Sequence, residues 1–576
     1  MKKTAAWLAV HALEQIGVRY TFGIPGVHTT ELYDELNNSQ QINPVLVTHE
    51  GGGAFMADAV SRCSDSIGTL VIVPAAGFTH AASGIGEALL DGIPMLVLSG
   101  GIQLDFDKRY QLHELDLLAL SKPLTKAQFR ITRHEDVIPT IHEAYRIATS
   151  GEPGPVFVEL PVTLQMAPGA VSELPAFVPA ASPGVPDAAV IARAALLLRE
   201  SKQPGLFVGW GARAAQAEVA AIAEYLQAPV ATTLQGLSSF PSDHPLHTGF
   251  GFGPAAVPAG RNAFARCDAM LAVGTRFGEI ATGSFGVTVP ANLVHVDINP
   301  QVFSANYPAV VSLEGDAKVV LGALLAELQK QAPRPVNSAL PLAIAKDKQD
   351  YLASWLAHDS AGRVNPGRFF AELRKQVSND AITVVDDGNH TYLTAELFGV
   401  RKGGQAIMPT DFNAMGYAVP AAIGAKLAQP QREVFGIVGD GAFMMTCMEA
   451  ITARMQGLGI VYYIFHDGEL SQISQAQQIP YNRKPCTVLS GLNVAGVAMA
   501  TGAAYVEIAN DNELANGIAE ARRLAAAGQV VMVDVLIDYS KATAFTKGAV
   551  KSNFKRFPLS MRLRLVGRAL VRKVTG

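Results

Sequence analysis

One stretch of the chain reads Val434-Phe435-Gly436-Ile437-Val438-Gly439-Asp440-Gly441-Ala442-Phe443, an apolar run that ends in an abrupt Gly-Asp-Gly turn. A short apolar run that stops at such a turn is typical of a strand buried on both faces. A helical pattern then extends to about Gly457, and a second apolar run follows at Ile460–Phe465. Two buried strands joined by a helix predict a parallel sheet with a right-handed crossover.

The same alternation of short apolar runs and longer helical patterns recurs through the 576 residues. The other predicted strands are Leu70–Val73, Met95–Ser99, Val156–Leu160, Gly205–Val208, Met270–Val273, Leu293–Val296, Ile382–Val385 and Val530–Leu536. Pro- and Ala-rich stretches at 175–186 and 331–342 break this rhythm and predict linkers. The sequence therefore predicts an α/β fold with three doubly wound parallel-sheet domains. The domains and a final tail would span 1–175, 187–330, 345–550 and 551–576.

The composition indicates a protein with several apolar cores and little charge bias. Apolar residues make up 49% of the chain and the formal net charge is −4, which gives no indication of nucleic-acid binding. The four cysteines form no Cys-x-x-Cys pair, which fits a reducing cytoplasm. The apolar N-terminal run is interrupted by His11, Glu14 and Gln15, so we expect an amphipathic helix rather than a signal peptide.

Asp440 and Asp467 each follow directly on a predicted strand, Asp467 within the turn His466-Asp467-Gly468-Glu469. Neighbouring parallel strands end at one edge of their sheet, so both carboxylates are expected at one site. The glycines beside Asp440 would let backbone N–H groups approach an anion at the start of the next helix. Carboxylate and phosphate oxygens suit Mg²⁺, although a lone Gly-Asp-Gly is also a common turn.

Two further segments accompany this pair. Asp387-Gly388-Asn389-His390 follows a predicted strand, and Asn413-Ala414-Met415-Gly416-Tyr417-Ala418-Val419-Pro420 precedes the strand that ends at Asp440. Together they resemble the diphosphate-binding half of thiamine-diphosphate enzymes. The resemblance implies a bent cofactor with Met415 as the wedge beneath it. The other implied cofactor contacts are Asn389, His390, Gly441, Ala442 and the backbone of Asn413 and Met415.

The resemblance also implies the metal ligands, which are Asp440, Asp467 and the backbone carbonyl of Glu469. The family usually has two asparagines where this chain has His466-Asp467. An aspartate keeps an oxygen ligand and adds negative charge beside a diphosphate. The metal site is therefore expected to persist, while the choice among magnesium, manganese and calcium stays open.

Thr48-His49-Glu50-Gly51-Gly52-Gly53-Ala54 resembles the His-Glu-x-x-Ala-Ala motif of the same family. The resemblance assigns Glu50 to a nitrogen of the pyrimidine ring, where a carboxylate favours the imino tautomer that removes the thiazolium proton. Holding base and carbon in contact is an orientation effect worth several kcal/mol. In the family the pyrimidine and diphosphate halves of the site meet across a subunit interface. This implies a homodimer as the minimum and a homotetramer as the usual form.

From about residue 4 to 545, the motif order resembles the acetolactate synthase and pyruvate oxidase branch, on segments such as Lys122-Pro123-Leu124-Thr125-Lys126 and Val296-Asp297-Ile298-Asn299-Pro300. Three histidines depart from acetolactate synthases. His113 stands where those enzymes have Gln, His80 stands where many have the Asn of Ser-Gly-Pro-Gly-Ala-Thr-Asn, and His28 follows a Gly-x-Pro-Gly turn. They could shuttle protons in one catalytic pocket, or some could be structural.

The loop after the metal ligands predicts part of the substrate pocket. Decarboxylases of the pyruvate decarboxylase type carry a Glu six residues after the metal-binding Asn, and this chain has Ile473 there, preceded by Gln472. Without that proton donor, an enamine could last long enough to attack a second carbonyl. This favours carboligation over plain decarboxylation, though a histidine could serve as donor.

The leading hypothesis is a thiamine-diphosphate-dependent, decarboxylating carboligase. It would join a 2-oxo acid and a carbonyl acceptor into an acyloin or a 2-hydroxy-3-oxo acid. A flavin-dependent, membrane-associated 2-oxo-acid oxidase and a C–C bond hydrolase of diketones are the alternatives. FAD stays open, because Gly209-Trp210-Gly211-Ala212-Arg213-Ala214 and the segment 274–283 match nucleotide-binding patterns only weakly.

The tail at 551–576 contains eight Lys or Arg residues and no acid. On a helix, one apolar face would hold Leu559, Leu563, Val566, Leu570 and Val574, opposite Arg564, Arg568 and Arg572. A basic amphipathic helix is typical of contact with a membrane surface, here the inner face. The alternative is an arm folded over the active site or a neighbouring subunit. We therefore expect a cytoplasmic protein, at most peripheral at the membrane.

Overall fold

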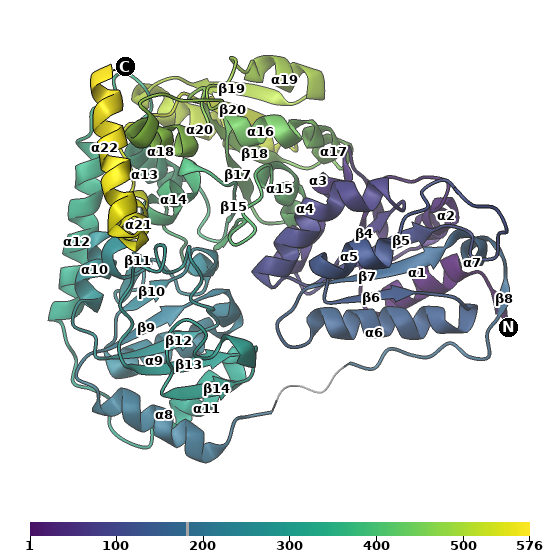
Figure 1. The fold of residues 1–576 in the computed structure, drawn as a ribbon, viewed down its shortest axis with the longest axis horizontal. Coiled ribbons are helices and arrows are strands. Elements are labelled where there is room, and N and C mark those ends of the chain that lie inside the picture. Colours follow the sequence, from purple (N-terminus) through teal and green to yellow (C-terminus); the bar gives the residue numbers. More distant parts are fainter. Residues whose placement is uncertain (180–183, 576) are drawn as a thin grey trace.

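The computed structural model describes residues 1–179 and 184–575 and contains three six-stranded parallel sheets flanked by helices (Figure 1). The first sheet has, in order, β3 (Asn43–Leu46), β2 (Tyr20–Gly23), β4 (Gly68–Ile72), β5 (Met95–Gly101), β7 (Pro155–Pro161) and β6 (Ala127–Arg130). Its helices are α1 (Ala5–Gln15), α2 (Thr30–Asn38), α3 (Glu50–Cys63), α4 (Ala76–Asp91), α5 (Leu117–Ser121), α6 (Val137–Thr149) and α7 (Val162–Met166). A short antiparallel pair, β1 (Lys2–Lys3) with β8 (Gly169–Ala170), closes this first domain.

The second sheet belongs to the central domain. Its order is β11 (His247–Phe250), β10 (Val230–Thr232), β9 (Pro204–Val208), β12 (Ala269–Val273), β13 (Asn292–Asp297) and β14 (Val311–Glu314). The helices around it are α8 (Ala188–Glu200), α9 (Gln216–Leu226), α10 (Pro258–Phe264) and α11 (Ala317–Leu328).

The third sheet carries the Gly-Asp-Gly turn. Its order is β16 (Gln405–Ile407), β15 (Ile382–Val385), β17 (Val434–Gly439), β18 (Ile460–Phe465), β20 (Val530–Val535) and β19 (Ala504–Ile508). Its helices are α12 (Ala339–Leu356), α13 (Pro366–Gln376), α14 (Asn389–Leu397), α15 (Ala418–Ala428), α16 (Asp440–Thr446), α17 (Ala450–Met455), α18 (Ser471–Tyr481), α19 (Val494–Thr501) and α20 (Leu514–Ala526). The predicted α/β class with three parallel sheets is confirmed.

The first and third domains pack through α3 and α15 (Figure 1). The two helices approach so closely that a Cβ on Gly424 would lie 2.2 Å from the carbonyl oxygen of Met56. Beside this contact, the fully buried Arg62 guanidinium bonds to Asp58 at 2.7 Å and to Asp91 at 2.8 Å. The network reaches the third domain through Tyr417, whose hydroxyl donates to Asp58 at 2.6 Å, and removal of one charged partner would leave an uncompensated buried charge.

The linker and tail predictions need adjustment. The predicted linker at 331–342 is shorter than expected because α12 begins at Ala339, and residues 180–183 of the other linker lie outside the described residues. The predicted start of the tail, residue 551, lies inside helix α21 (Ala544–Arg556), which follows directly on the third domain. The last helix, α22 (Leu559–Thr575), follows it along one side of the molecule (Figure 1).

Helix α22 packs on α18 through its charged face. The guanidinium groups of Arg568 and Arg572 lie 5.0 and 5.3 Å from the centre of the Tyr481 ring. On the apolar face, Leu563 and Leu570 are more than half exposed. Within the described residues, no helix is both long enough and apolar enough to cross a membrane. Contact of the tail with a membrane surface stays a prediction.

Candidate active site

The register of the third sheet sets the two aspartates beside each other. Gly439 pairs with Phe465, so the turns that follow β17 and β18 start at the same level. Asp440 accepts a hydrogen bond from the backbone N–H of Gly441 and another from that of Gly468, each at 2.8 Å. Asp440 thereby joins the turn that holds Asp467.

Burial raises the pKa of both carboxyls, and the pKa of Asp467 reaches about 6 with a further contribution from the charge of Asp440. Each carboxylate disfavours ionisation of the other, so a cation bound between them would stabilise both charges. The Glu469 side chain is held by Lys484 at 2.6 Å, and His466 bonds to Asp534 at 2.9 Å. The structure thus brings Asp440, Asp467 and the Glu469 loop together as the sequence predicts.

Several buried polar atoms at this edge have no hydrogen-bond partner among the described residues. They are Oδ1 of Asp387, Nε2 of His390, Oδ1 of Asp467 and Oε1 of Gln472. Buried polar groups in proteins are nearly always partnered, so this cluster indicates a polar ligand. A diphosphate with a bound cation fits, because it would supply anionic oxygens to the imidazole and a metal to the carboxylate.

His390 is shaped for that contact. It lies in the first turn of α14 next to the half-buried Asn389, and burial lowers its pKa to about 3, so the ring is neutral. Added Cβ atoms on Gly388 or Gly439 would meet the ring at 2.6 and 3.0 Å. The two glycines therefore leave the space in which this imidazole sits. Gly441 and Ala442 are buried in the first turn of α16, which begins at Asp440.

The segment that holds Asn413 and Met415 is fixed from two sides. Asp386 accepts hydrogen bonds from the N–H groups of Gly416 at 2.9 Å and Ala418 at 2.7 Å. Asn413 has a φ of +63°, a conformation that asparagine tolerates better than most residues. Met415 is half-buried against the shared core of the first and third domains. The sequence motifs did not predict Asp386 as a site residue, although it directly precedes Asp387.

The other support comes from the first domain. Glu87 on α4 accepts hydrogen bonds from the N–H groups of Thr410 at 3.2 Å and Ala414 at 3.0 Å. Burial and the charge of Asp91 raise the pKa of Glu87 to about 9. No motif marks Glu87 in the sequence, since its role depends on a contact between two domains.

Glu50 is the first residue of α3 and is buried. The loop before it is held by Glu449 of the third domain, which accepts hydrogen bonds from the N–H groups of Thr48 and His49 at 3.2 and 3.0 Å. Glu50 itself bonds to His80, within the first domain. Among the described residues, no hydrogen bond or ion pair joins Glu50 to Asp440 or Asp467.

The three predicted pocket histidines fall into two sets of contacts. The rings of His28 and His113 meet edge to face, with centroids 5.3 Å apart, and His113 has a φ of +65°. Burial lowers the pKa of His28, and the neighbouring His113 lowers it further. His80 instead bonds to Glu50. Gln472 and Ile473 lie in the first turn of α18, where Ile473 is about half exposed (51%).

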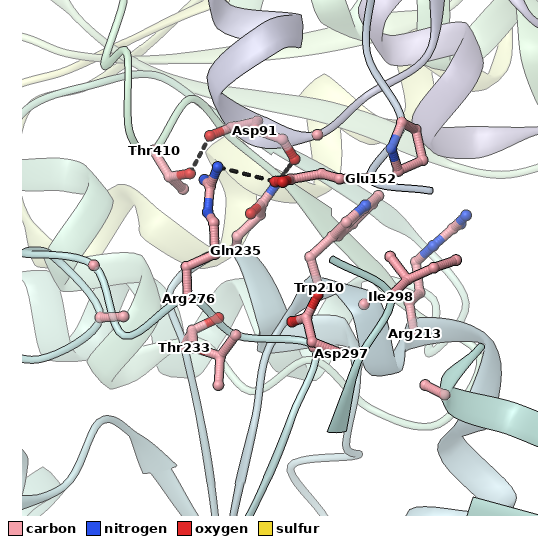
Figure 2. A pocket seen from close by; sticks show the side chains of 18 of the residues that line it. Asp91, Glu152, Trp210, Arg213, Thr233, Gln235, Arg276, Asp297, Ile298 and Thr410 are labelled. Atoms are coloured by element: carbon pink, nitrogen blue, oxygen red, sulfur yellow. Dashed lines mark hydrogen bonds and ion pairs between the residues drawn. The ribbon is translucent and has the colours of Figure 1, made fainter. Parts of the chain in front are cut away.

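A separate cavity of about 360 Å³ lies where the central domain meets the other two (Figure 2). Trp210, Arg213 and Asp297 line it from the central domain. Arg276 reaches across it and bonds to Glu152 at 3.0 Å and to Asp411. Burial raises the pKa of Asp297 to about 6. This volume is at the lower end of the range for small-molecule pockets.

Three family models match the chain: the N-terminal TPP binding domain of thiamine pyrophosphate enzymes over 3–120, their central domain over 191–324, and their C-terminal TPP binding domain over 386–535. Each matched range contains at least four strands of one sheet, and the Glu50 and Asp440 motifs fall in the ranges matched by the two TPP binding domains. The chain belongs to the thiamine pyrophosphate enzyme family.

Relatives of this thiamine pyrophosphate enzyme include acetolactate synthases. The acetolactate synthase large subunit of Corynebacterium glutamicum is 32% identical over 83% of this chain and 77% of its own length. The probable acetolactate synthase large subunit of Methanocaldococcus jannaschii is 30% identical over 92% of both chains. The isozyme 3 large subunit of Escherichia coli is 28% identical over 93% of this chain and 95% of its own.

Metal binding by this family member is expected to depend on pH through Asp467. Its pKa of about 6 means that a proton competes with the cation in weakly acidic solution. Metal affinity should fall about tenfold per pH unit below about pH 6, and Asp467→Asn should move that fall to lower pH. Measurement of Mn²⁺ affinity as a function of pH, in the parent protein and in Asp467→Asn, tests this. Identical pH dependence in both proteins would exclude Asp467 as the titrating ligand.

Proposed function

We propose that this protein is a thiamine-diphosphate-dependent carboligase that decarboxylates a 2-oxo acid and joins the remaining carbons to a carbonyl acceptor. The observation that carries the proposal is the set of buried, unpartnered polar atoms at Asp387, His390 and Asp467, together with the intact Glu50 motif. The acetolactate synthase relatives, matched over most of their length, support 2-oxo acids as substrates.

The residues divide the work between two domains. Asp440, Asp467 and the carbonyl of Glu469 would hold the cation, with Mg²⁺ the expected metal. Backbone groups at the start of α14 and α16 would hold the diphosphate through Asn389, His390, Gly441 and Ala442. Met415 would support the bent cofactor, and Asn413 and Met415 would bind its pyrimidine through their backbone.

Thiamine diphosphate, when bound, supplies a carbon that adds to the ketone of a 2-oxo acid and accepts the electron pair left by departing carbon dioxide. Glu50 would bind the pyrimidine nitrogen and exchange a proton with it. His28 and His113 would face the substrate as proton donors or hydrogen-bond donors to its oxygens. Ile473 would line the pocket with an apolar, aprotic side chain, which favours addition to a second carbonyl over protonation.

The experiment is identification of the products from ¹³C-labelled pyruvate with thiamine diphosphate and Mg²⁺. A product with a new carbon–carbon bond supports the carboligase. Acetaldehyde alone would indicate plain decarboxylation. Opening of a cyclic diketone without carbon dioxide release would favour the C–C bond hydrolase. The acetolactate synthase relatives do not support that alternative.

We also propose a homodimer as the smallest active form, with a homotetramer as the expected assembly. In the family, the pyrimidine half of the site around Glu50 and the diphosphate half around Asp440 meet across a subunit interface, so we expect a second subunit to complete each half. Large apolar side chains beside Asp440, among them Met444, Met445 and Met448, are 40–58% exposed, which is typical of an interaction surface.

We propose that the central cavity does not bind flavin tightly enough to retain it during purification. Its lining holds five carboxylates, including Asp91, Asp297 and Asp316, against two guanidinium groups, those of Arg213 and Arg276, and Arg276 is already paired with two of the carboxylates. A second anionic diphosphate is disfavoured in such surroundings. Visible absorbance of the purified protein should therefore lack flavin bands. A flavin spectrum that bleaches with pyruvate would instead support the oxidase.

A further inference from the structure

The bond between Glu50 and His80 has no role in the mechanism above. Oε2 of Glu50 lies 2.9 Å from Nδ1 of His80. The Glu50 side chain is 7% exposed, whereas 49% of the His80 side chain is exposed. The buried carboxyl thus bonds to an imidazole that is itself half exposed.

His80 is held firmly in this position. Its ring stacks on that of His49, with centroids 4.7 Å apart and an angle of 24°. Nδ1 of His49 accepts the N–H of Gly51 at 3.0 Å, so this ring nitrogen acts as an acceptor in the contact. Ala75, at a φ of +55°, turns the chain into α4 and so sets the start of the helix that carries His80.

A carboxyl that exchanges a proton in each turnover needs a partner that can hydrogen-bond to both its ionised and its protonated form. The Nδ1 atom of imidazole can donate to the carboxylate or accept from the carboxylic acid, without movement of a heavy atom. An asparagine, which many acetolactate synthases are expected to have at this position, offers a hydrogen bond but cannot carry the proton onward. Histidine has a second nitrogen that can.

We infer that His80 is a positioning residue that relays protons between Glu50 and the exposed part of the His80 ring. The inference rests on the proposed role of Glu50. In the relay, the acid proton of Glu50 passes to Nδ1 of His80, which becomes an imidazolium, and the proton on Nε2 leaves to water or buffer. The neutral imidazole with its proton on Nδ1 then remains beside the carboxylate, and the reverse sequence recharges Glu50.

The other ionisable groups around the pair are already engaged. Tyr33 on α2 donates its hydroxyl to the carbonyl of Val71, and burial together with the charge of Glu50 raises its pKa far above neutrality. Glu449 accepts backbone N–H groups and the Thr452 hydroxyl, and burial raises its pKa. Since His49 caps α3, His80 is the group best placed to exchange the proton.

The test measures exchange of the cofactor's reactive C–H with deuterium by rapid quench and NMR, on protein loaded with thiamine diphosphate and Mg²⁺. His80→Ala should slow exchange about 100-fold, and added imidazole should restore much of it. His49→Asn, which keeps a cap for α3, should change exchange far less. Calorimetry should show that His80→Ala binds thiamine diphosphate as tightly as the parent protein.

A second measurement needs no cofactor. A ¹³C NMR titration of the Glu50 carboxyl, assigned with Glu50→Gln, should show its chemical shift following two ionisations in the parent protein and one in His80→Ala. Unchanged exchange in His80→Ala, or slowed exchange with no imidazole rescue and an unaltered Glu50 titration, would overturn the relay. Unchanged exchange in Glu50→Gln would instead overturn the proposed role of Glu50.

Discussion

Glu50→Gln should lower turnover of a 2-oxo acid by about 10²- to 10⁴-fold, the usual contribution of a positioned acid–base group. The amide keeps the size of the side chain and its contact with His80, but it cannot give or take the proton that the pyrimidine nitrogen requires. Affinity for thiamine diphosphate should change little, because the proposed anchors of the diphosphate and metal lie in the third domain.

The measurement is steady-state turnover of pyruvate at saturating cofactor, with calorimetry of cofactor binding beside it. Glu31→Gln, an exposed carboxylate on α2, is the matched control and should behave like the parent protein. Full activity in Glu50→Gln would remove Glu50 from the chemistry. Loss of cofactor binding in step with activity would indicate a structural role instead.

Asp440→Asn should weaken binding of Mg²⁺ and cofactor about 10- to 100-fold, which corresponds to the 1.5–3 kcal/mol typical of a charged hydrogen-bonding group. One amide oxygen can replace only one of the two acceptors that now bind Gly441 and Gly468. At limiting cofactor the variant should be inactive, and excess cofactor and metal should restore part of its activity. Equal affinity in variant and parent would exclude Asp440 as a ligand.

The two inactive variants together test where the active site is built. If Glu50 of one subunit serves the cofactor site of another, a mixed dimer of Glu50→Gln and Asp440→Asn has one intact site. Random exchange of subunits should then restore about a quarter of the parent activity at limiting cofactor. A mixture that stays inactive after verified exchange would place both halves of the site in one chain.

Apolar runs predicted ten of the twelve interior strands but missed β2, β10 and the strands at the sheet edges. β4, β5, β7, β9, β12, β13, β15, β17, β18 and β20 are each buried on both faces, and all were expected from continuous apolar runs. The strands β6 and β19 lie at sheet edges with mixed burial, so their composition resembles that of loops. The helix α12 was partly taken for a linker because Pro341 lies in its first turn, where proline is tolerated.

The residues of the candidate site likewise divide into those that sequence motifs predicted and those that they missed. Asp440, Asp467 and Glu50 are predicted site residues because they stand in sequence motifs that resemble those of the family. Glu87, Asp386 and Glu449 were missed because they act by accepting backbone N–H groups from distant segments, which leaves no spacing to detect. The sequence left open whether His80 shares a pocket with His28 and His113, and its contact with Glu50 depends on side-chain geometry.

The most direct test of the account is carbon dioxide release from pyruvate by protein stripped of metal and cofactor with a chelator and then reconstituted. Stripped protein should release none. Thiamine diphosphate and Mg²⁺ together should restore release, either one alone should not, and Asp440→Asn should need more of both. Release without thiamine diphosphate, or none from pyruvate and longer 2-oxo acids with both present, would contradict the proposed function.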